Sequence, residues 1–153
     1  MEIAIRKMER GDEKFVVDLM REFFNSSATI TNASEKIFAA NFKNCLDDSI
    51  CAEGFVFVDG EKIIGYAVTA KGYATEFGGE CIWLEDIFIK AEYRGRGLGS
   101  KFIRHVKELY PEKILRLEAQ ADDSRLLNFY KRFGFKELPY LELVCEKKRA
   151  ENF

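Results

Sequence analysis

A glycine-rich stretch of the sequence has the residue types needed to bind a phosphate group. It reads Arg94-Gly95-Arg96-Gly97-Leu98-Gly99-Ser100 and lies between an apolar run typical of a strand and a segment with helical spacing. Glycines let backbone N–H groups approach an anion, and the amino end of a helix carries partial positive charge. Residues 94–100 therefore predict an anion site at a strand-to-helix turn, with an ordinary turn as the alternative.

Charge is distributed unevenly around this turn. Residues 90–116 contain eight Lys or Arg and three Asp or Glu, a balance of +5, whereas the whole chain has a net charge of −2. The overall balance argues against a broadly cationic nucleic-acid-binding protein. The dinucleotide fingerprint is disfavoured because Gly99 comes one residue early for its third glycine, and no P-loop with Gly-Lys-Ser/Thr is present.

Two carboxylates lie within the apolar run that precedes the turn. Glu85 and Asp86 interrupt the apolar run from Cys81 to Ile89, which reads as a strand. Strand alternation would send neighbouring side chains to opposite faces of a sheet. At least one carboxylate should therefore point toward whatever covers its face.

The remaining elements follow from hydrophobic spacing and turn residues. A helix capped by Asp12 follows a first strand, and Asn32 with Glu35 resembles a capping box for a second helix. Asp59-Gly60 predicts a hairpin turn, and Gly72–Gly79 reads as a loop. The other expected elements are strands Ile3–Ile5, Phe55–Val58, Ile63–Ala70 and Ile114–Ala119, helices starting at Leu98 and at Asp122 or Asp123, and closing strands Phe135–Leu138 and Tyr140–Glu146. This order predicts an α/β protein with a mixed sheet and helices on both faces.

Length and composition fit one domain over residues 1–153. The chain has 153 residues, of which 47% are apolar, enough to form one core. No apolar run approaches the roughly 18 residues of a membrane span, and the first residues lack signal-peptide features. Four cysteines without CxxC spacing disfavour a metal site or disulfide framework. A soluble, cytoplasmic protein without metal or membrane association is expected.

The spacing Arg94-x-x-Gly97-x-Gly99 resembles the acetyl-CoA pyrophosphate motif of the GNAT superfamily of N-acetyltransferases. Locally, residues 83–89, 92–95 and 127–132 resemble spermidine/spermine and other diamine acetyltransferases. The resemblance implies a GNAT-like fold, with a central, mostly antiparallel sheet, helices on both faces and a splayed strand pair that holds acetyl-CoA.

The same resemblance implies direct transfer of an acetyl group from acetyl-CoA to a primary amine. An alkylamine with a pKa of ~10.4 is protonated at neutral pH, so presenting its free base costs about 4.6 kcal/mol unless a proton acceptor is near. Glu85 matches the family's proposed general base, acting directly or through water, and Asp86 remains an alternative. Tyr130 matches the general acid that protonates the CoA thiolate, since a phenol stays protonated near pH 7.

The implied acetyl-CoA contacts fall into three groups. Backbone N–H groups of Ile87, Phe88 and Ile89 would donate hydrogen bonds to the thioester oxygen, and the same strand edge would pair with the pantetheine amides. The diphosphate would bind Arg94, Gly95, Arg96, Gly97, Leu98, Gly99 and Ser100, and further contacts would come from Asp123, Leu126, Phe129 and Tyr130. Asp123 stands where the family usually has Asn, so a helix cap is an alternative role. Leu126 replaces a common small residue.

A small amine such as a polyamine, diamine or amino acid is the expected acceptor. A peptide or protein amine is the second hypothesis, and a non-catalytic CoA-binding sensor is a third. Acidic side chains that would line the approach of a cation are Glu35, Asp47, Asp48, Glu76 and Asp86. No nucleic-acid partner is expected, and a homodimer is compatible with the resemblance because dimers are common in the family.

Overall fold

The computed structural model describes residues 2–48 and 50–146, and the chain divides into two compact units, Met1–Ala119 and Gln120–Phe153. The first unit contains β1 (Ala4–Lys7), η1 (Arg10–Asp12), α1 (Glu13–Phe24), α2 (Glu35–Cys45), β2 (Ala52–Asp59), β3 (Lys62–Ala74), β4 (Gly79–Ile89), η2 (Ala91–Tyr93), α3 (Leu98–Leu109) and β5 (Ile114–Leu117). The second unit contains α4 (Ser124–Lys131). Within the described ranges, no helix has the length and apolarity needed to cross a membrane.

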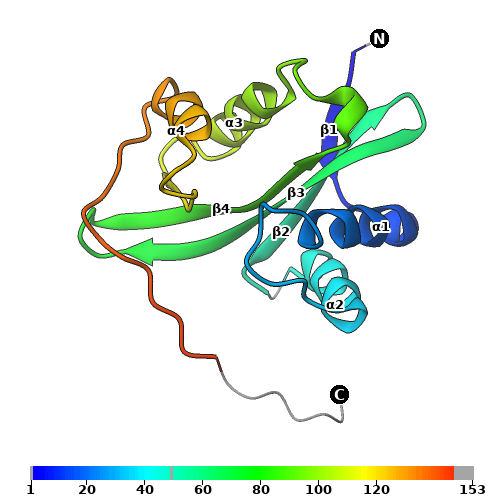
Figure 1. Ribbon diagram of the computed structural model, residues 1–153, viewed down its shortest axis with the longest axis horizontal. Helices are drawn as coiled ribbons and strands as arrows, with labels where there is room; N and C mark the ends of the chain where they lie inside the picture. The colour runs from blue at the N-terminus through cyan, green and yellow to red at the C-terminus, as the bar shows by residue number, and fades with distance from the viewer. Residues whose placement is uncertain (1, 49, 147–153) are drawn as a thin grey trace. The chain divides into compact units, whose positions relative to one another are not determined.

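The strands of the first unit form a five-stranded sheet in the order β1-β2-β3-β4-β5 (Figure 1). Neighbouring strands run antiparallel from β1 to β4, and β5 runs parallel to β4. The connection between these parallel strands contains α3, as a crossover of this kind requires. The mixed, mostly antiparallel sheet expected from the sequence is confirmed.

Helices cover both faces of this sheet. Val56 lies in one hydrophobic cluster with residues of α1 and α2, such as Met20 and Phe38. Its neighbours Phe55 and Phe57 point the other way and contact Phe102 of α3, with ring centroids 5.6 and 5.8 Å apart. Figure 1 shows α1 and α2 on one side of the strands and α3 on the other. Alternation along β2 therefore builds two apolar layers, each closed by helices.

The β2–β3 hairpin turns at two residues, Gly60 and Glu61, with Asp59 paired to Lys62. Gly60 has a φ of +63°, which an L-residue rarely adopts. The position of the predicted Asp-Gly turn is thus confirmed. The other predicted loop, Gly72–Gly79, is too long, because β3 continues to Ala74 and β4 begins at Gly79.

The helix starts differ from the sequence prediction in one case. Ser34, rather than Asn32, is the N-cap of α2, and its hydroxyl accepts a hydrogen bond from the N–H of Ile37 at 3.3 Å. Asp12 is the N-cap of α1, as predicted. Its carboxylate, however, accepts hydrogen bonds from Arg6 at 2.8 and 3.0 Å and from the N–H of Glu9 instead of capping the helix.

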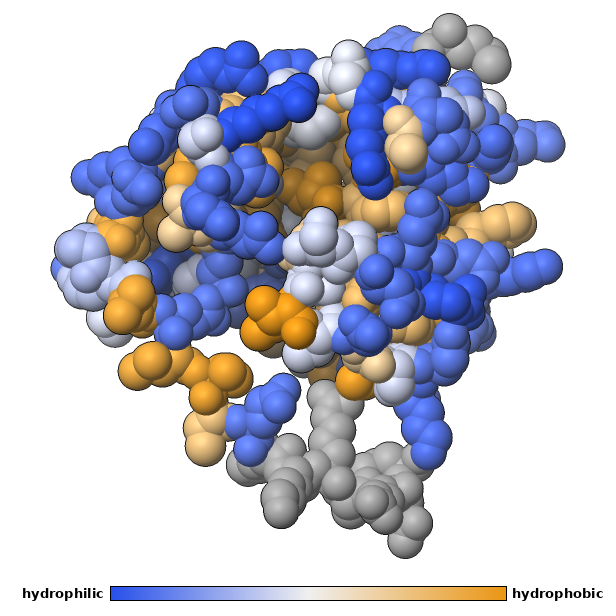
Figure 2. Space-filling view, in the orientation of Figure 1, coloured by the Kyte–Doolittle hydropathy of each residue, from blue (hydrophilic) through white to orange (hydrophobic). Residues whose placement is uncertain are grey.

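The two predicted closing strands are wrong for the described part of the chain, which has no strand from residue 135 to residue 146. Apolar side chains of this segment are exposed, including Leu141 and Leu143, each at 91%. Figure 2 shows that orange, hydrophobic side chains occur on the visible face of the molecule among the blue ones. An alternating sequence forms a strand only where a partner supplies backbone hydrogen bonds, and Pro139 lacks an N–H to donate.

Candidate active site

The first feature of the site is an edge of β4 that separates from β5. β4 pairs with β3 along most of its length, but its register with β5 extends only from Cys81↔Ile114 to Leu84↔Leu117. Within the described chain, residues 85–89 therefore have no β5 partner on their outer edge. This is the splayed strand pair expected from the sequence. Backbone N–H and C=O groups along such an edge can hydrogen-bond an extended ligand.

A β-bulge lies at the point where the strands separate. Asp86 is opposite Val68 and Leu84 is opposite Thr69, so Glu85 is the extra residue of β4. Asp86 consequently shares a face with Val68, which packs on the α1–α2 side, while Leu84 shares a face with the buried Thr69. The regular alternation assumed from the sequence is interrupted here. Bulges turn a side chain away from the position that plain alternation gives it, and they are frequent beside active sites.

Asp86 is a carboxylate in a largely apolar environment. Its Oδ2 accepts a hydrogen bond from the hydroxyl of the fully buried Tyr66 at 3.1 Å. Desolvation raises the pKa of Asp86 to about 6, the Tyr66 hydrogen bond opposes this rise, and the charge of Glu85 adds to it. The pKa of Tyr66 is raised by the same burial and by the charge of Asp86. Asp86 therefore changes charge close to neutral pH.

Glu85 is exposed at the bulge, and its charge acts on Asp86, so the two carboxylates lie close to one another. One of them is solvent-exposed and the other is partly buried against the sheet. The pair thus offers two carboxylates with different environments at the splayed edge, which is the arrangement that separates acid–base roles.

The glycine turn after β4 has the backbone conformation that its sequence predicts. Gly95 and Gly97 have φ values of +76° and +75°. A Cβ built at either glycine would have nothing within 4 Å, so conformation rather than crowding requires glycine at these two positions. Arg94 to Gly97 are exposed, whereas the side chain of Leu98 is buried. Leu98 can therefore contribute to a ligand site through its backbone N–H.

The amino end of α3 is open to an anion. Its N-cap residue is Gly97, which has no side chain to satisfy the first N–H groups, and its first turn contains no acidic residue. The starts of α2 and α4 differ, because Ser34 and Asp123 accept hydrogen bonds there. The N–H groups of Leu98, Gly99 and Ser100 belong to this first turn, where unpaired donors and the helix dipole favour an anion.

The cations of the turn are held in part by the backbone. Arg94 donates from Nε to the carbonyl of Ile89 at 2.8 Å, and its guanidinium lies 5.3 Å from the centre of the Phe88 ring. Arg96 donates to the carbonyl of Glu92 at 3.1 Å. Lys101 instead donates to the carbonyl of Ile3 and lies 3.5 Å from Glu2. Arg94 and Arg96 are thus the side-chain cations of the turn itself.

The second unit places Tyr130 on α4. Its ring contacts Phe129 and Phe135, with centroid separations of 5.1 and 5.7 Å, and burial raises its pKa. The phenol is therefore protonated at neutral pH and can act as a proton donor. Asp123 caps the same helix, because its carboxylate accepts a hydrogen bond from the N–H of Leu126 at 3.0 Å. The alternative role of Asp123 as a helix cap, predicted from the sequence, is therefore present.

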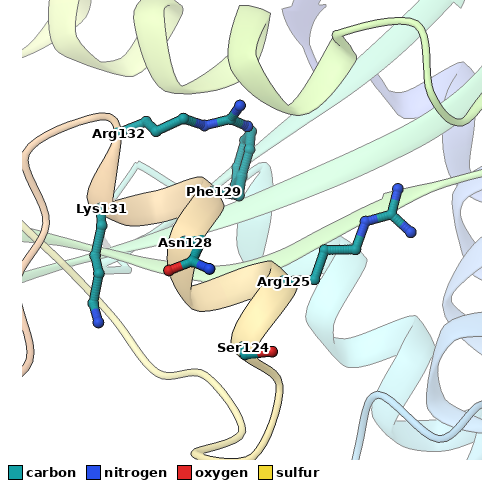
Figure 3. Close-up of a pocket in the computed structure, with 6 residues that line it drawn as sticks. All are labelled: Ser124, Arg125, Asn128, Phe129, Lys131 and Arg132. Atoms are coloured by element: carbon teal, nitrogen blue, oxygen red, sulfur yellow. The ribbon is translucent and has the colours of Figure 1, made fainter.

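A pocket lies against α4 and is lined by Ser124, Arg125, Asn128, Phe129, Lys131 and Arg132 (Figure 3). The guanidinium of Arg132 lies 5.7 Å from the centre of the Phe129 ring, and Figure 3 shows Lys131 pointing away from both. Phe129 contacts this cation and Tyr130 at once. Its ring is therefore part of the packing that orients the phenol.

One of the acidic residues expected to line the amine approach is already paired. Glu35 accepts two hydrogen bonds from Arg21, at 2.5 and 2.9 Å, which lower its pKa. Its charge is balanced by a cation from α1. Asp86 is the acidic candidate that lies on the splayed strand itself. Tyr66, its partner, was not found from the sequence, because an apolar strand position gives no signal of a hydrogen bond to another strand.

Comparison with known proteins agrees with this geometry. Residues 14–135 match the acetyltransferase (GNAT) family. The chain is 32% identical to a thialysine N-epsilon-acetyltransferase of Bos taurus over 152 residues, which cover 92% of this chain and 88% of that protein. It is 37% identical over 70 residues to a spermine/spermidine N(1)-acetyltransferase of Bacillus subtilis, covering 43% of this chain and 46% of that protein.

The fold matches a solved acetyltransferase structure as well. A protein from Clostridium acetobutylicum described as a predicted acetyltransferase, whose crystal structure contains acetyl-CoA, superposes with a TM-score of 0.74 at 18% identity, and the match covers 94% of this chain and 96% of that chain. The splayed sheet, the glycine turn and the open start of α3 thus occur in a chain whose sequence and fold both match one family. The protein belongs to the GNAT family and is an N-acetyltransferase.

Proposed function

We propose that the protein transfers the acetyl group of acetyl-CoA directly to a primary amine of a small cationic molecule, such as a polyamine, a diamine or an amino acid. The observation that carries this proposal is that the unpaired edge of β4, the glycine turn and the uncapped start of α3 follow one another along the chain. Together they present backbone hydrogen-bonding groups for an extended ligand that ends in a diphosphate. The similarity to enzymes named for thialysine and for spermine and spermidine supports a small amine acceptor.

The backbone would bind most of acetyl-CoA. The pantetheine amides would hydrogen-bond the outer edge of β4 at Ile87 to Ile89 in the manner of an added strand. The diphosphate would lie at the N–H groups of Leu98, Gly99 and Ser100, with Arg94 and Arg96 beside it. An N–H group of the β4 edge would also donate a hydrogen bond to the thioester oxygen and so stabilise the negative charge that develops there. Positions in α4, including Asp123, Leu126 and Phe129, remain proposed contacts.

Transfer needs one proton acceptor and one proton donor. The amine nitrogen attacks the thioester carbon with its lone pair, the C–S bond breaks, and CoA leaves as a thiolate. Glu85 takes the proton that the amine loses, directly or through water, because it is exposed at the bulge beside the β4 edge. Tyr130 gives its proton to the thiolate, and its raised pKa keeps it protonated until that step.

Asp86 is assigned a different role from Glu85. It is partly buried and fixed by Tyr66, so its ionised form provides a localised negative charge that attracts the ammonium group of the acceptor. Its pKa of about 6 means that this charge is present at neutral pH and is lost in mild acid. A cytoplasmic location, a single domain over residues 1–153 and a homodimer remain predictions from the sequence.

The decisive assay measures thiol release from acetyl-CoA with a panel of polyamines, diamines, amino acids and peptides. Small amines that carry a second positive charge are expected to give the highest kcat/KM. In Tyr130→Phe, kcat should fall by about 100-fold or more, the range contributed by a general acid, while the affinity for acetyl-CoA stays near the parent value.

Tyr73→Phe is the matched control, because it removes the hydroxyl of an exposed tyrosine on β3 that has no role in the proposed transfer. It should lower kcat far less than Tyr130→Phe. Release that no amine accelerates would instead support a non-catalytic CoA-binding sensor. Preference for peptides over all small amines would favour a protein N-acetyltransferase, and a Tyr130→Phe enzyme within a few fold of the parent would remove Tyr130 as the acid.

A further inference from the structure

Tyr93 joins the glycine turn to a distant part of the sheet. It is the last residue of η2 and directly precedes Arg94, and its hydroxyl donates to Asp59 Oδ2 at 3.1 Å. Asp59 is the last residue of β2, at the hairpin. Tyr93, which directly precedes the glycine turn, is thereby hydrogen-bonded to the β2–β3 hairpin.

The carboxylate of Asp59 depends on this hydroxyl. Its second oxygen, Oδ1, is buried and has no hydrogen-bond partner among the residues that the structure describes. A hydrogen bond to an ionised group is stronger than one between neutral groups, and a carboxylate withdrawn from water that loses a donor is destabilised further. Removing the Tyr93 hydroxyl should therefore displace one of the two partners rather than leave both in place.

The ring of Tyr93 also contacts two cations. The guanidinium of Arg96 lies 5.0 Å from the ring centre, and Lys62 Nζ lies 5.8 Å from it. Both separations allow attraction between a cation and the face of an aromatic ring. Because Arg96 is a proposed diphosphate contact, the position of this ring influences where that guanidinium lies.

Besides the hydrogen bonds of Arg94 and Arg96 to the carbonyls of Ile89 and Glu92, the glycines of the turn contribute no side-chain contacts. Gly95 and Gly97 have open space where a side chain would be, and Arg94 and Arg96 are exposed. The start of η2 is fixed by a backbone hydrogen bond from Lys90 to Ile64 at 2.9 Å. The Tyr93–Asp59 contact then fixes its other end, next to the glycines. A loop held in its ligand-bound shape loses less entropy when the ligand binds.

We propose that Tyr93 and Asp59 form a positioning pair that holds the glycine turn ready for the diphosphate of acetyl-CoA. This inference rests on the proposed function and adds to it two residues outside the glycine turn. Neither residue touches the reacting atoms in this role. The pair should therefore affect how tightly acetyl-CoA binds and leave the chemical step unchanged.

The test is Tyr93→Phe, with kinetics at saturating amine and calorimetry of CoA binding. The KM for acetyl-CoA and the Kd for CoA should both rise about 5- to 20-fold, the range expected for a lost hydrogen bond to a charged group, while kcat stays within about twofold. Tyr110→Phe is the matched control, because the Tyr110 hydroxyl also donates to a carboxylate, Glu53, at the far end of α3. It should leave KM and Kd at the parent values.

The same contact is tested from the carboxylate side, so the result does not depend on one variant. Asp59→Asn keeps a neutral acceptor for the hydroxyl and should weaken acetyl-CoA binding less than Asp59→Ala, which should match Tyr93→Phe. Combining Asp59→Ala with Tyr93→Phe should add little, as for two residues that act through one contact.

Three outcomes would overturn the positioning role: parent-like KM and Kd in Tyr93→Phe, a fall in kcat with KM unchanged, or equal losses in Asp59→Asn and Asp59→Ala. Each of them leaves the proposed function standing, because the parent still binds acetyl-CoA and acetylates an amine. A parent protein that binds no CoA would instead overturn the proposed function, and the positioning role with it.

Discussion

The buried carboxylate of Asp86 lowers the stability of the fold and at the same time places a negative charge at the proposed site. Its ionised form is disfavoured in the folded protein by desolvation, and Tyr66 compensates with a single hydrogen bond. An acid whose pKa is higher in the folded state than in the unfolded state makes the fold less stable as pH rises from the unfolded to the folded pKa. For Asp86 this interval runs from 3.8 to about 6.

The Asp86→Asn variant should therefore be more stable than the parent, and increasingly so as pH rises. An amide keeps an acceptor for Tyr66 and carries no charge to desolvate. With the two pKa values above, the stability gain should be about 1 kcal/mol larger at pH 8 than at pH 5. Urea denaturation of both proteins at the two pH values measures this difference. Asp122→Asn, at an exposed position, is the control and should give the same small effect at both.

Activity should change in the opposite direction. At pH 8, Asp86→Asn should lower kcat/KM for a doubly charged amine by about tenfold, because it removes an attraction of roughly 1–2 kcal/mol to the ammonium group. A variant with no stability gain at pH 8 and unchanged kcat/KM would contradict both the desolvated charge and its role in binding the acceptor.

At the residue scale, the sequence predicts local backbone geometry well. The glycine spacing of residues 94–100 indicates the turn in which Gly95 and Gly97 have positive φ, and the position of Asp123 before α4 indicates the helix cap that the structure has. The binding of an anion at the turn stays a prediction. The sequence does not predict Tyr66 and Asp59 as hydrogen-bond partners, because the fold brings each of them to a residue of another element. A sequence contains no local mark of such a contact.

At the scale of elements, the start of α3 combines two requirements. The chain must turn between η2 and α3, and in the proposed function the first helical N–H groups must stay free for an anion. Gly97 meets both, because it adopts a φ of +75° and adds no side chain over the helix end. Any residue with a Cβ at this φ is strained by roughly 1–2 kcal/mol.

The Gly97→Ala variant should lose about 1 kcal/mol of unfolding free energy and bind CoA more weakly. Its loss must come from backbone conformation, since no atom lies within 4 Å of the added Cβ. Gly11→Ala is the matched control, because that glycine also has open space but no positive φ. Thermal denaturation and calorimetry should show no loss for Gly11→Ala, and a Gly97→Ala protein equal to it would contradict the conformational requirement.

The sequence predicted most strands and helices of the first unit because hydrophobic spacing within each one is regular. It did not predict the bulge at Glu85, since one extra residue changes the faces of a strand without changing its composition. The predicted closing strands are wrong for a related reason. Alternation of apolar and polar residues shows that a segment could form a strand, but it does not show that a neighbouring strand is there to pair with it. Residues 140–146 have the pattern of a strand and lie exposed in the described structure.

Over the whole molecule, charge is divided between a cationic segment and an acidic remainder. Residues 90–116 contribute +5 to a chain whose net charge is −2. That segment contains the glycine turn, Arg94, Arg96 and α3, while Glu85 and Asp86 lie just before it. In the proposed function, this division would attract a polyanionic donor and a cationic acceptor to neighbouring positions along one stretch of chain.

This division predicts that salt weakens the binding of acetyl-CoA. Raising NaCl from 50 to 500 mM shortens the screening length from roughly 14 to about 4 Å, so the KM for acetyl-CoA should rise several-fold at saturating amine while kcat changes little. Arg96→Gln should flatten this dependence, because it removes a charge next to the diphosphate. Arg104→Gln removes an equal charge from the exposed face of α3 and should flatten it less. A KM that is independent of salt in all three proteins would mean that backbone donors bind the diphosphate without help from the surrounding charge.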